Sequence, residues 1–477
     1  MGQEITVSQF DQRNFEDFYQ KLKLETRLLG QLVKNNGCSS KSPVAGFEVE
    51  AWLLDQQMLP APLNESYLEA LNDPMASQEL AKFNIELNNN PVALSGDAFS
   101  RLYQQLEQTW VNACVQAENM DLHLLMIGTL PTMQQDSLNL NNMSDMNRYR
   151  ALNEQILRAR GKPIHLDITG NEHLRFDHHD VMLESATTSF QIHTQIPLAI
   201  AHHYYNASII ASAAVIAISA NAPYLFGKDL WAESRIPLFE QAIETGGYAG
   251  AAHGPIRRVS FGSDYARLSI MECFTENLEH FPVLLPTAFD APADEFSHLR
   301  LHNGTIWRWN RPLLGFDDNG TPHIRVEHRI PPAGPTIIDS IANAAFYYGL
   351  ATNLSADIAN NGLPFPFAQA KDNFYQAARF GLKTQITWYD NHKHHINELI
   401  ENELLTRAES GLQSLGIDQN DIDGFLGIIH QRNANKQNGS NWQRQFIKHN
   451  NTDFKAMTRQ YLDNQKTGNP VAEWGLD

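Results

Sequence analysis

Four short segments of the chain alternate between apolar residues and residues that could bind a metal ion or a phosphate. They are residues 46–52, 83–88, 190–196 and 324–330. Their polar positions hold Glu48, Glu50, Glu86, Gln191, His193, Arg325, Glu327 and Arg329. Alternation with a period of two predicts β-strands that bury one face against the core. If these strands lie side by side, the chemistry-bearing residues share the other face.

The carboxylates on this predicted face point to divalent metal ions. Glutamates crowded together repel one another, and their pKa values rise unless cations neutralise them. Mg²⁺ prefers oxygen ligands and usually keeps substrate phosphates in its shell. The four glutamates Glu48, Glu50, Glu86 and Glu327 supply enough oxygens for two Mg²⁺ ions, and His193 could add a nitrogen ligand.

Two arginines flank one of these glutamates. Arg325 and Arg329 lie two residues on either side of Glu327, so all three are predicted on one strand face. A phosphoryl group held between a metal ion and guanidiniums would suit this arrangement. We therefore predict that Arg325, Glu327 and Arg329 are catalytic residues of a nucleotide-dependent phosphoryl transfer. The sequence contains neither a P-loop nor a Rossmann glycine motif.

Helical patterns separate the predicted strands. They cover residues 97–120, 147–161, 198–220 and 337–360, and the chain after about residue 371 is predicted to be largely helical. Strands scattered among helices without strict βαβ alternation favour the α+β class. The apolar run at 204–220 is interrupted by serines and is too short to span a membrane, so it predicts a buried helix.

Taken in order, the motifs resemble the glutamate–cysteine ligase family in its second branch, which includes bacterial and plant-type carboxylate–amine ligases. The likeness rests on Gly46–Glu50, Ile85–Asn88, Thr188–His193, Asn221–Tyr224, Trp231–Arg235, Arg325–Arg329 and Gly334–Asp339. Each motif alone is weak, but their common order over roughly residues 45–385 is fairly specific.

The resemblance implies a fold similar to glutamine synthetase and the guanidino kinases. In such a fold a curved, mainly antiparallel sheet of about six strands binds Mg-ATP on its concave face and is surrounded by helices. The implied reaction uses ATP and two or more Mg²⁺ ions to phosphorylate a carboxylate, usually the γ-carboxylate of glutamate. An amine then attacks the acyl phosphate. The resemblance leaves the amine open, with cysteine as one candidate.

The resemblance also implies roles for single residues. The implied Mg²⁺ ligands are Glu48, Glu50, Glu86, His193 and Glu327, and the implied nucleotide contacts are Glu48, Glu50, Arg325 and Arg329. The implied contacts to the amino-acid substrate are Arg235, Arg311 and Gln191. For Arg311 a second interpretation is packing beside the tryptophans of residues 304–312. The expected domains are a catalytic domain of residues 1–385 and a helical C-terminal extension of residues 386–477 packed on it.

Composition limits the partners. The 477 residues include 36 Lys and Arg against 54 Asp and Glu, a formal net charge of −18. Such a chain lacks the basic surface of a nucleic-acid binder, and an anionic membrane would repel it. Three cysteines without CxxC spacing and an N-terminus without a signal-peptide pattern favour the cytoplasm. We expect small amino-acid and amine substrates, no nucleic acid, no membrane, and a homodimer.

Three other functions compete with ligation. A phosphotransferase of the guanidino-kinase type could use the same Mg-ATP site without forming an amide. A non-catalytic nucleotide-binding protein is a further alternative, although every expected ligand position is filled. A metal-dependent hydrolase ranks last, because it would call for a ligand set rich in His and Asp.

Overall fold

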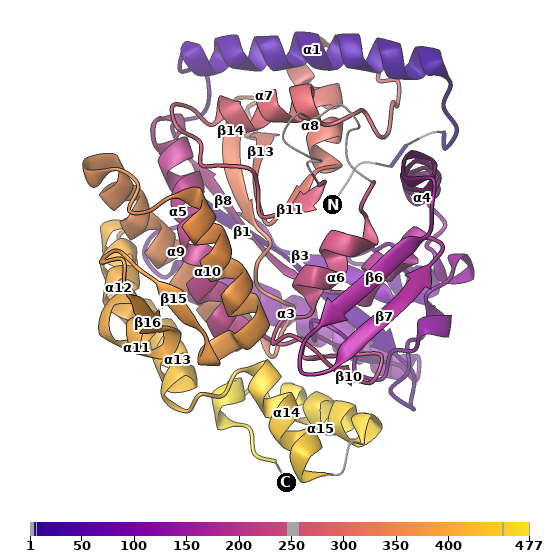
Figure 1. Ribbon diagram of the computed structural model, residues 1–477, viewed down its shortest axis with the longest axis vertical. Coiled ribbons are helices and arrows are strands. Elements are labelled where there is room, and N and C mark those ends of the chain that lie inside the picture. The colour runs from indigo at the N-terminus through magenta and orange to yellow at the C-terminus, as the bar shows by residue number, and fades with distance from the viewer. Residues whose placement is uncertain (1–3, 6, 246–256, 451–452, 477) are drawn as a thin grey trace.

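The four predicted strands lie in one curved antiparallel sheet of the computed structural model, which describes residues 4–5, 7–245, 257–450 and 453–476 (Figure 1). Six strands follow one another in the order β13 (Asn310–Phe316), β14 (Pro322–His328), β8 (Phe190–Ile196), β1 (Val44–Leu54), β3 (Asn84–Asn88) and β2 (Ala76–Gln78). The short strands β4 (Val92–Ala93) and β5 (His123–Leu125) also pair with β1. The α+β class and the sheet of about six strands are confirmed.

The register of these strands brings the predicted polar residues together. Glu48 lies opposite Gln191 of β8 on one side and Asn88 of β3 on the other. Glu50 lies opposite Glu86. Because directly opposed residues point to the same face of a sheet, the alternation seen in each segment becomes one continuous polar surface.

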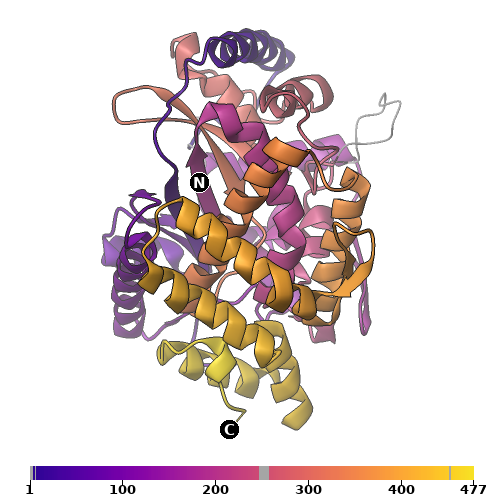
Figure 2. The same cartoon turned by 90° about the vertical axis from the view of Figure 1, so that its left-hand side faces the viewer.

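The opposite face of the sheet is covered by helices. Phe47 packs on Phe190 of the neighbouring strand and on Tyr348 of α9 (Ile337–Asn361). The Tyr348 hydroxyl donates a hydrogen bond to the His193 carbonyl. Helix α5 (Ala201–Ser219) runs beside α9 and is buried over nearly its whole length, which explains its mainly apolar, uncharged sequence (Figure 2). None of the described helices is long and apolar enough to cross a membrane.

Further elements frame the ends of the sheet. Helix α1 (Gln12–Lys34) lies across α7 (Met271–His280) and α8 (Ser297–Gly304), where Glu25 is paired with His298 (Figure 1). The hairpin of β6 (Ile164–Thr169) and β7 (His173–His178) packs beside α6 (Arg235–Ala242). The other elements on this part of the chain are α2 (Asn64–Leu71), α3 (Ala98–Asn119), α4 (Asn147–Arg160), β9 (Tyr224–Leu225), β10 (Lys228–Asp229), β11 (Val259–Ser260) and β12 (Trp307–Arg308).

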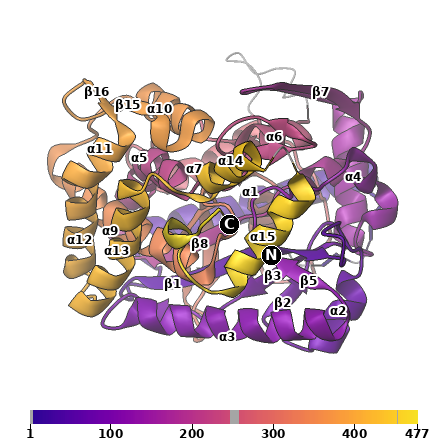
Figure 3. The same ribbon diagram turned by 90° about the horizontal axis from the view of Figure 1, so that it is seen from below.

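The C-terminal part is mainly helical, as predicted. Its elements are α10 (Phe367–Phe380), β15 (Gln385–Thr387), β16 (Lys393–His395), α11 (Ile396–Leu399), α12 (Leu405–Ser414), α13 (Gln419–Ala434), α14 (Gly439–His449) and α15 (Phe454–Lys466). Seen from below, α14 and α15 lie across the ends of the sheet strands (Figure 3). Helices α9 and α12 cross at Gly349 and Gly411, where a Cβ atom on either glycine would lie within 2.2 Å of the other helix's backbone. The division at residue 385 stays a prediction.

Candidate active site

The first cluster of site residues lies at the middle of the sheet. Glu48, His193 and Glu327 come from β1, β8 and β14, and one potential ligand atom of each lies within 4.8 Å of the others. His193 Nε2 is 3.2 Å from Glu48 Oε1 and 4.0 Å from Glu327 Oε1. Two carboxylates around one imidazole make a donor set that a divalent cation can use.

Two atoms of this cluster suggest that a cation fits it. Glu48 Oε2 and His193 Nδ1 are buried, and neither has a hydrogen-bond partner within the described part of the chain. Burial alone would raise the pKa of Glu48, but the attraction of His193 outweighs it and holds the pKa well below its usual range. Glu48 is therefore a carboxylate with an open oxygen, as a metal ligand must be.

Glu327 is held in place by two arginines. Arg311 of β13 grips it with two hydrogen bonds, from Nε to Oε2 at 2.8 Å and from Nη2 to Oε1 at 2.9 Å. Arg329 Nη1 lies 3.4 Å from Oε2. Burial would raise the pKa of Glu327, but Arg311, Arg329 and His193 together lower it to about 2. Glu327 is thus fixed and ionised although only 1% of its surface is exposed.

The second cluster lies two residues further along β1. It consists of Glu50, Glu79 and Glu86, with one carboxylate oxygen of each within 4.8 Å of the others. Ser189 fixes Glu50 by donating from its backbone N–H at 2.8 Å and from its hydroxyl at 2.7 Å. Asn88 Nδ2 donates to Glu86 Oε1 at 3.1 Å. The sequence did not predict Glu79, which follows the three-residue strand β2.

Burial makes several carboxylates in and beside the second cluster hard to ionise. Burial raises the pKa of Glu50 despite the opposing charge of Arg329. Burial and the charges of Glu86 and Glu50 raise the pKa of Glu79 further. Burial, with the charge of Glu50, also raises the pKa of Glu184 to about 8. A group of carboxylates that resists ionisation in this way is the expected state of a cation site before its cation binds.

Arg329 and Gln191 join the two clusters. Arg329 Nη1 donates to Gln191 Oε1, and Gln191 Nε2 donates to Glu50 Oε1 at 3.1 Å. Arg329 thus contacts both Glu327 of the first cluster and the amide that contacts Glu50 of the second. Burial opposes its charge, but Glu327, Glu50 and Glu48 outweigh this and raise the pKa of Arg329.

The guanidinium groups of Arg325 and Arg311 differ in how many of their donors are already hydrogen-bonded. Arg325 is half-buried, and its Nε has no hydrogen-bond partner in the described ranges. Arg311 is fully used: besides Glu327, its Nη1 contacts the carbonyls of Asn303, Gly304 and Ile306 at 3.2–3.4 Å. Arg325 could meet a phosphate, whereas the predicted substrate contact of Arg311 would require this pairing to break.

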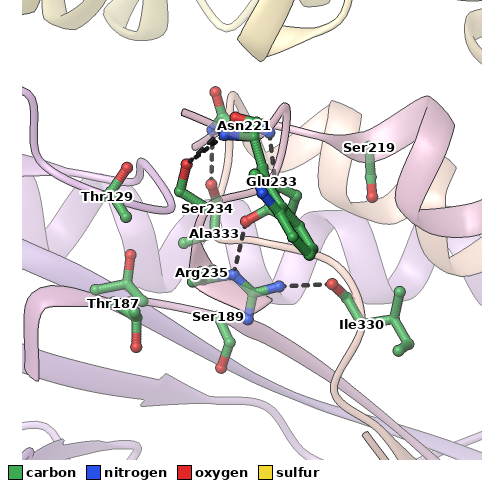
Figure 4. A network of polar contacts seen from close by, with 12 residues as sticks. Thr129, Thr187, Ser189, Ser219, Asn221, Glu233, Ser234, Arg235, Ile330 and Ala333 are labelled. Atoms are coloured by element: carbon green, nitrogen blue, oxygen red, sulfur yellow. Dashed lines mark hydrogen bonds and ion pairs between the residues drawn. The ribbon is translucent and has the colours of Figure 1, made fainter. Parts of the chain in front are cut away.

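Arg235 lies near the second cluster, at the first residue of α6. Its Nε donates to Glu233 Oε1 at 3.0 Å, and its Nη2 donates to the Ile330 carbonyl at 2.6 Å (Figure 4). Glu50 and Arg329 are close enough to influence its charge, while burial lowers its pKa. The third guanidinium nitrogen points toward Ser189 in Figure 4 and makes no hydrogen bond with the described residues.

Three residues of the site were missed by sequence reasoning, namely Glu79, Glu184 and Ser189. Ser189 lies within a recognised motif, next to the alternating strand, so only its contact with Glu50 is new. Glu79 follows a three-residue strand and Glu184 lies on a short 3₁₀ helix, and neither stretch shows a periodic pattern in the sequence. A separate hollow of about 720 Å³, beside residues 131–136 and the start of α15, contains none of the predicted site residues.

One solved structure supports a shared fold. The chain is similar to glutamate–cysteine ligase of Francisella tularensis in complex with AMP, with a TM-score of 0.52, 12% identity, and coverage of 92% of this chain and 91% of that chain. It also matches a bifunctional glutathione synthetase from Pasteurella multocida, with a TM-score of 0.46 and 11% identity, over 91% of this chain and 54% of that one. A search of curated protein sequences gives no match.

The family model described as "Glutamate-cysteine ligase family 2" matches residues 44–465, which is most of the chain. The matched range includes every residue of both carboxylate clusters and extends through most of the C-terminal helices. The resemblance inferred from the motifs is therefore confirmed. The chain belongs to glutamate–cysteine ligase family 2 and is an ATP-dependent carboxylate–amine ligase of that type.

Proposed function

We propose that this enzyme uses Mg-ATP to convert the γ-carboxylate of glutamate into an acyl phosphate, which an amine then attacks to form an amide. The observation that carries the proposal is the pair of carboxylate clusters on one sheet face, joined by Arg329 and Gln191. Cysteine is the leading amine on family grounds. Small amino-acid and amine substrates, a cytoplasmic location and a homodimer remain predictions for this chain.

The carboxylate clusters would hold the metal ions. Glu48, His193 and Glu327 are proposed as ligands of one ion, and Glu50, Glu79 and Glu86 as ligands of another. Bound Mg²⁺ supplies charge neutralisation for the phosphates and for the phosphoryl group in transfer. Glu79 joins the ligand set predicted from the motifs because its carboxylate converges with Glu50 and Glu86.

The arginines would bind the anionic groups of the substrates. Arg329 lies between the clusters, so its guanidinium can stabilise negative charge on the transferred phosphoryl oxygens. Arg325, four residues before Arg329 and two before Glu327, is proposed to contact a phosphate that is not transferred. Gln191 and Glu327 already orient Arg329, so this side chain needs little reorganisation when the nucleotide binds.

The amino-acid substrate is proposed to lie at the Arg235 end of the sheet. Arg235 keeps one guanidinium nitrogen available beside Ser189 and could hold a substrate carboxylate there (Figure 4). Gln191 could contact the carboxylate that is being activated, because it lies between Arg329 and Glu50. In the second step the amine lone pair forms the C–N bond, the bond between the acyl carbon and the phosphate oxygen breaks, and the amine gives up a proton.

The first test is ADP release from Mg-ATP and glutamate with a panel of amines that includes cysteine, together with mass spectrometry of the products. Amine-dependent ADP release with a new amide supports the ligase. A phosphorylated product without an amide would favour the phosphotransferase. ATP binding without turnover in any mixture would favour the non-catalytic alternative.

Substitutions then test the metal assignment. Glu48→Gln and Glu327→Gln each remove one carboxylate charge at nearly constant volume, so ADP release should fall below detection while the far-UV circular dichroism stays unchanged. Glu69→Gln on the exposed side of α2 is the matched control and should keep full activity. Full activity of either site variant would contradict the proposed ligands.

A further inference from the structure

Residues 221–235, the segment that ends at Arg235, are held in place by hydrogen bonds to the two C-terminal helices α14 and α15. The first residue of this segment, Asn221, is completely buried and has partners on three different parts of the chain. Gln443 of α14 donates from Nε2 to Asn221 Oδ1 at 2.9 Å and to the Asn221 carbonyl at 3.1 Å. Asn221 Nδ2 in turn donates to the Tyr461 hydroxyl of α15 at 2.8 Å.

The same asparagine contacts the groups that hold Arg235. Its backbone N–H donates to Glu233 Oε2 at 2.9 Å, and Glu233 Oε1 accepts from Arg235 Nε (Figure 4). Its side-chain amide also donates to the Ala333 carbonyl at 2.8 Å. Ala333 lies in the segment after β14, whose Ile330 carbonyl accepts from Arg235 Nη2. Asn221 therefore ties together both segments that fix the guanidinium.

The helix pair is in close contact with this asparagine. A Cβ atom on Gly439 would lie 1.9 Å from Asn221 Oδ1, so α14 can approach only because residue 439 is glycine. The Ser440 backbone N–H donates to the Ala220 carbonyl at 2.8 Å. These contacts use uncharged groups buried in the fold, and such contacts have fixed geometry because an unpaired buried polar group is costly.

We propose that Gln443 and Tyr461 are positioning residues for substrate binding, which act through Asn221 and Glu233 to set the orientation of Arg235. The helices α14 and α15 then belong functionally to the binding site for the amino-acid substrate, although they lie far along the chain from the metal ligands. This inference rests on the proposed role of Arg235 in holding the substrate carboxylate.

The test compares steady-state kinetics of the full-length enzyme, with L-glutamate as the varied substrate and hydroxylamine as the amine. Tyr461→Phe and Gln443→Leu should each raise the KM for glutamate about 5-fold, equivalent to roughly 1 kcal/mol, because each removes the polar group that hydrogen-bonds Asn221. The KM for ATP should change less than twofold. Tyr67→Phe is the matched control, because it also removes a buried hydroxyl with a carbonyl partner, here Ala113 at 2.7 Å.

Combination with Arg235→Lys separates positioning from general stability. Arg235→Lys alone should raise the KM for glutamate at least 10-fold, and adding Tyr461→Phe to it should raise this KM less than twofold further, because both changes affect the same contact. Glutamate KM values of Tyr461→Phe and Gln443→Leu that stay within twofold of wild type would overturn the positioning role while leaving the function of Arg235 intact. An unchanged glutamate KM in Arg235→Lys would contradict the role of Arg235 and would overturn the positioning role with it. The ligase activity itself is tested separately, by the ADP-release assay of the wild type.

Discussion

Replacing Arg311 by leucine tests two properties of the site separately, namely the stability of the fold and the Mg²⁺ dependence of ADP release. In the native protein Arg311 and Glu327 are 4% and 1% exposed, and two hydrogen bonds of 2.8 and 2.9 Å join them. Arg311→Leu leaves Glu327 buried with only Arg329 at 3.4 Å and His193 at 4.0 Å. The charge of Glu327 then loses its strongest partner but cannot reach water.

The expected cost is about 3–5 kcal/mol, the range for removing one member of a buried ion pair. The unfolding entropy of a chain of this length is about 1 kcal/mol/K, so the melting temperature should fall by about 3–5 °C. The double variant Arg311→Leu/Glu327→Leu should regain at least half of this loss, because apolar side chains can replace a buried pair without leaving a charge behind. It should nevertheless remain inactive, since the proposed metal ligand Glu327 is gone.

Calorimetry on the metal-free protein and Mg²⁺ titration of ADP release measure the two effects. The half-saturating Mg²⁺ concentration of Arg311→Leu should rise 10–100-fold, as expected when a group that orients a metal ligand is removed. A melting temperature within about 1 °C of wild type would refute the reasoning. So would a double variant that is less stable than Arg311→Leu alone, because the cost would then not come from the isolated charge of Glu327.

Three further predictions follow from the second cluster and the helix packing. Glu79→Gln should raise the half-saturating Mg²⁺ concentration at least 10-fold with little change in circular dichroism, and an unchanged titration would remove Glu79 from the ligand set. Because the pKa of Glu184 is raised to about 8, the metal-free folded protein holds a proton that the unfolded chain releases near pH 4.5. Relative to a Glu184→Gln variant, the unfolding free energy of the wild type should therefore fall as pH rises from 5 to 8, and calorimetry in EDTA that shows the same pH dependence for both proteins would contradict the raised pKa of Glu184. Gly411→Ala should destabilise the protein by about 1–3 kcal/mol, because its Cβ would meet the Gly349 carbonyl at 1.9 Å, and denaturant unfolding that matches wild type would contradict this packing.

The alternation of residues was enough to predict the strands that carry most of the site. Glu48, Glu86, His193 and Glu327 each lie on a strand with one face on the core, so the period of two was visible in the sequence. The order of the motifs then predicted the family and with it the curved sheet. Both levels of inference depend on local patterns, which the chain shows directly.

Residues outside such patterns could not be placed from the sequence. Glu79 follows a strand of only three residues, and it meets Glu50 and Glu86 through the pairing of β2 with β3. Glu184 lies on a short 3₁₀ segment among apolar neighbours. The substrate contact of Arg311 stays a prediction, and what the sequence did not indicate is that Arg311 lies opposite Glu327 in the pairing of β13 with β14. The pairing of β13 with β14 is a hairpin with a short loop, whereas β14 with β8 and β8 with β1 join segments far apart along the chain, and no local spacing indicates those pairings.

The two clusters share strand β1, and this has a consequence for how the family can diversify. Glu48 and Glu50 are two residues apart on that strand, so the backbone rise alone sets their separation along it at about 6.7 Å. This spacing along the backbone fixes how far apart the two proposed ions lie along β1, and side-chain substitutions elsewhere do not change it. If Arg235 holds the substrate as proposed, mutations near it can alter which substrate is accepted while the spacing of Glu48 and Glu50 stays unchanged. An insertion of a single residue between Glu48 and Glu50 would instead turn one of these glutamates to the helix-covered face of the sheet, and its cluster would lose that carboxylate.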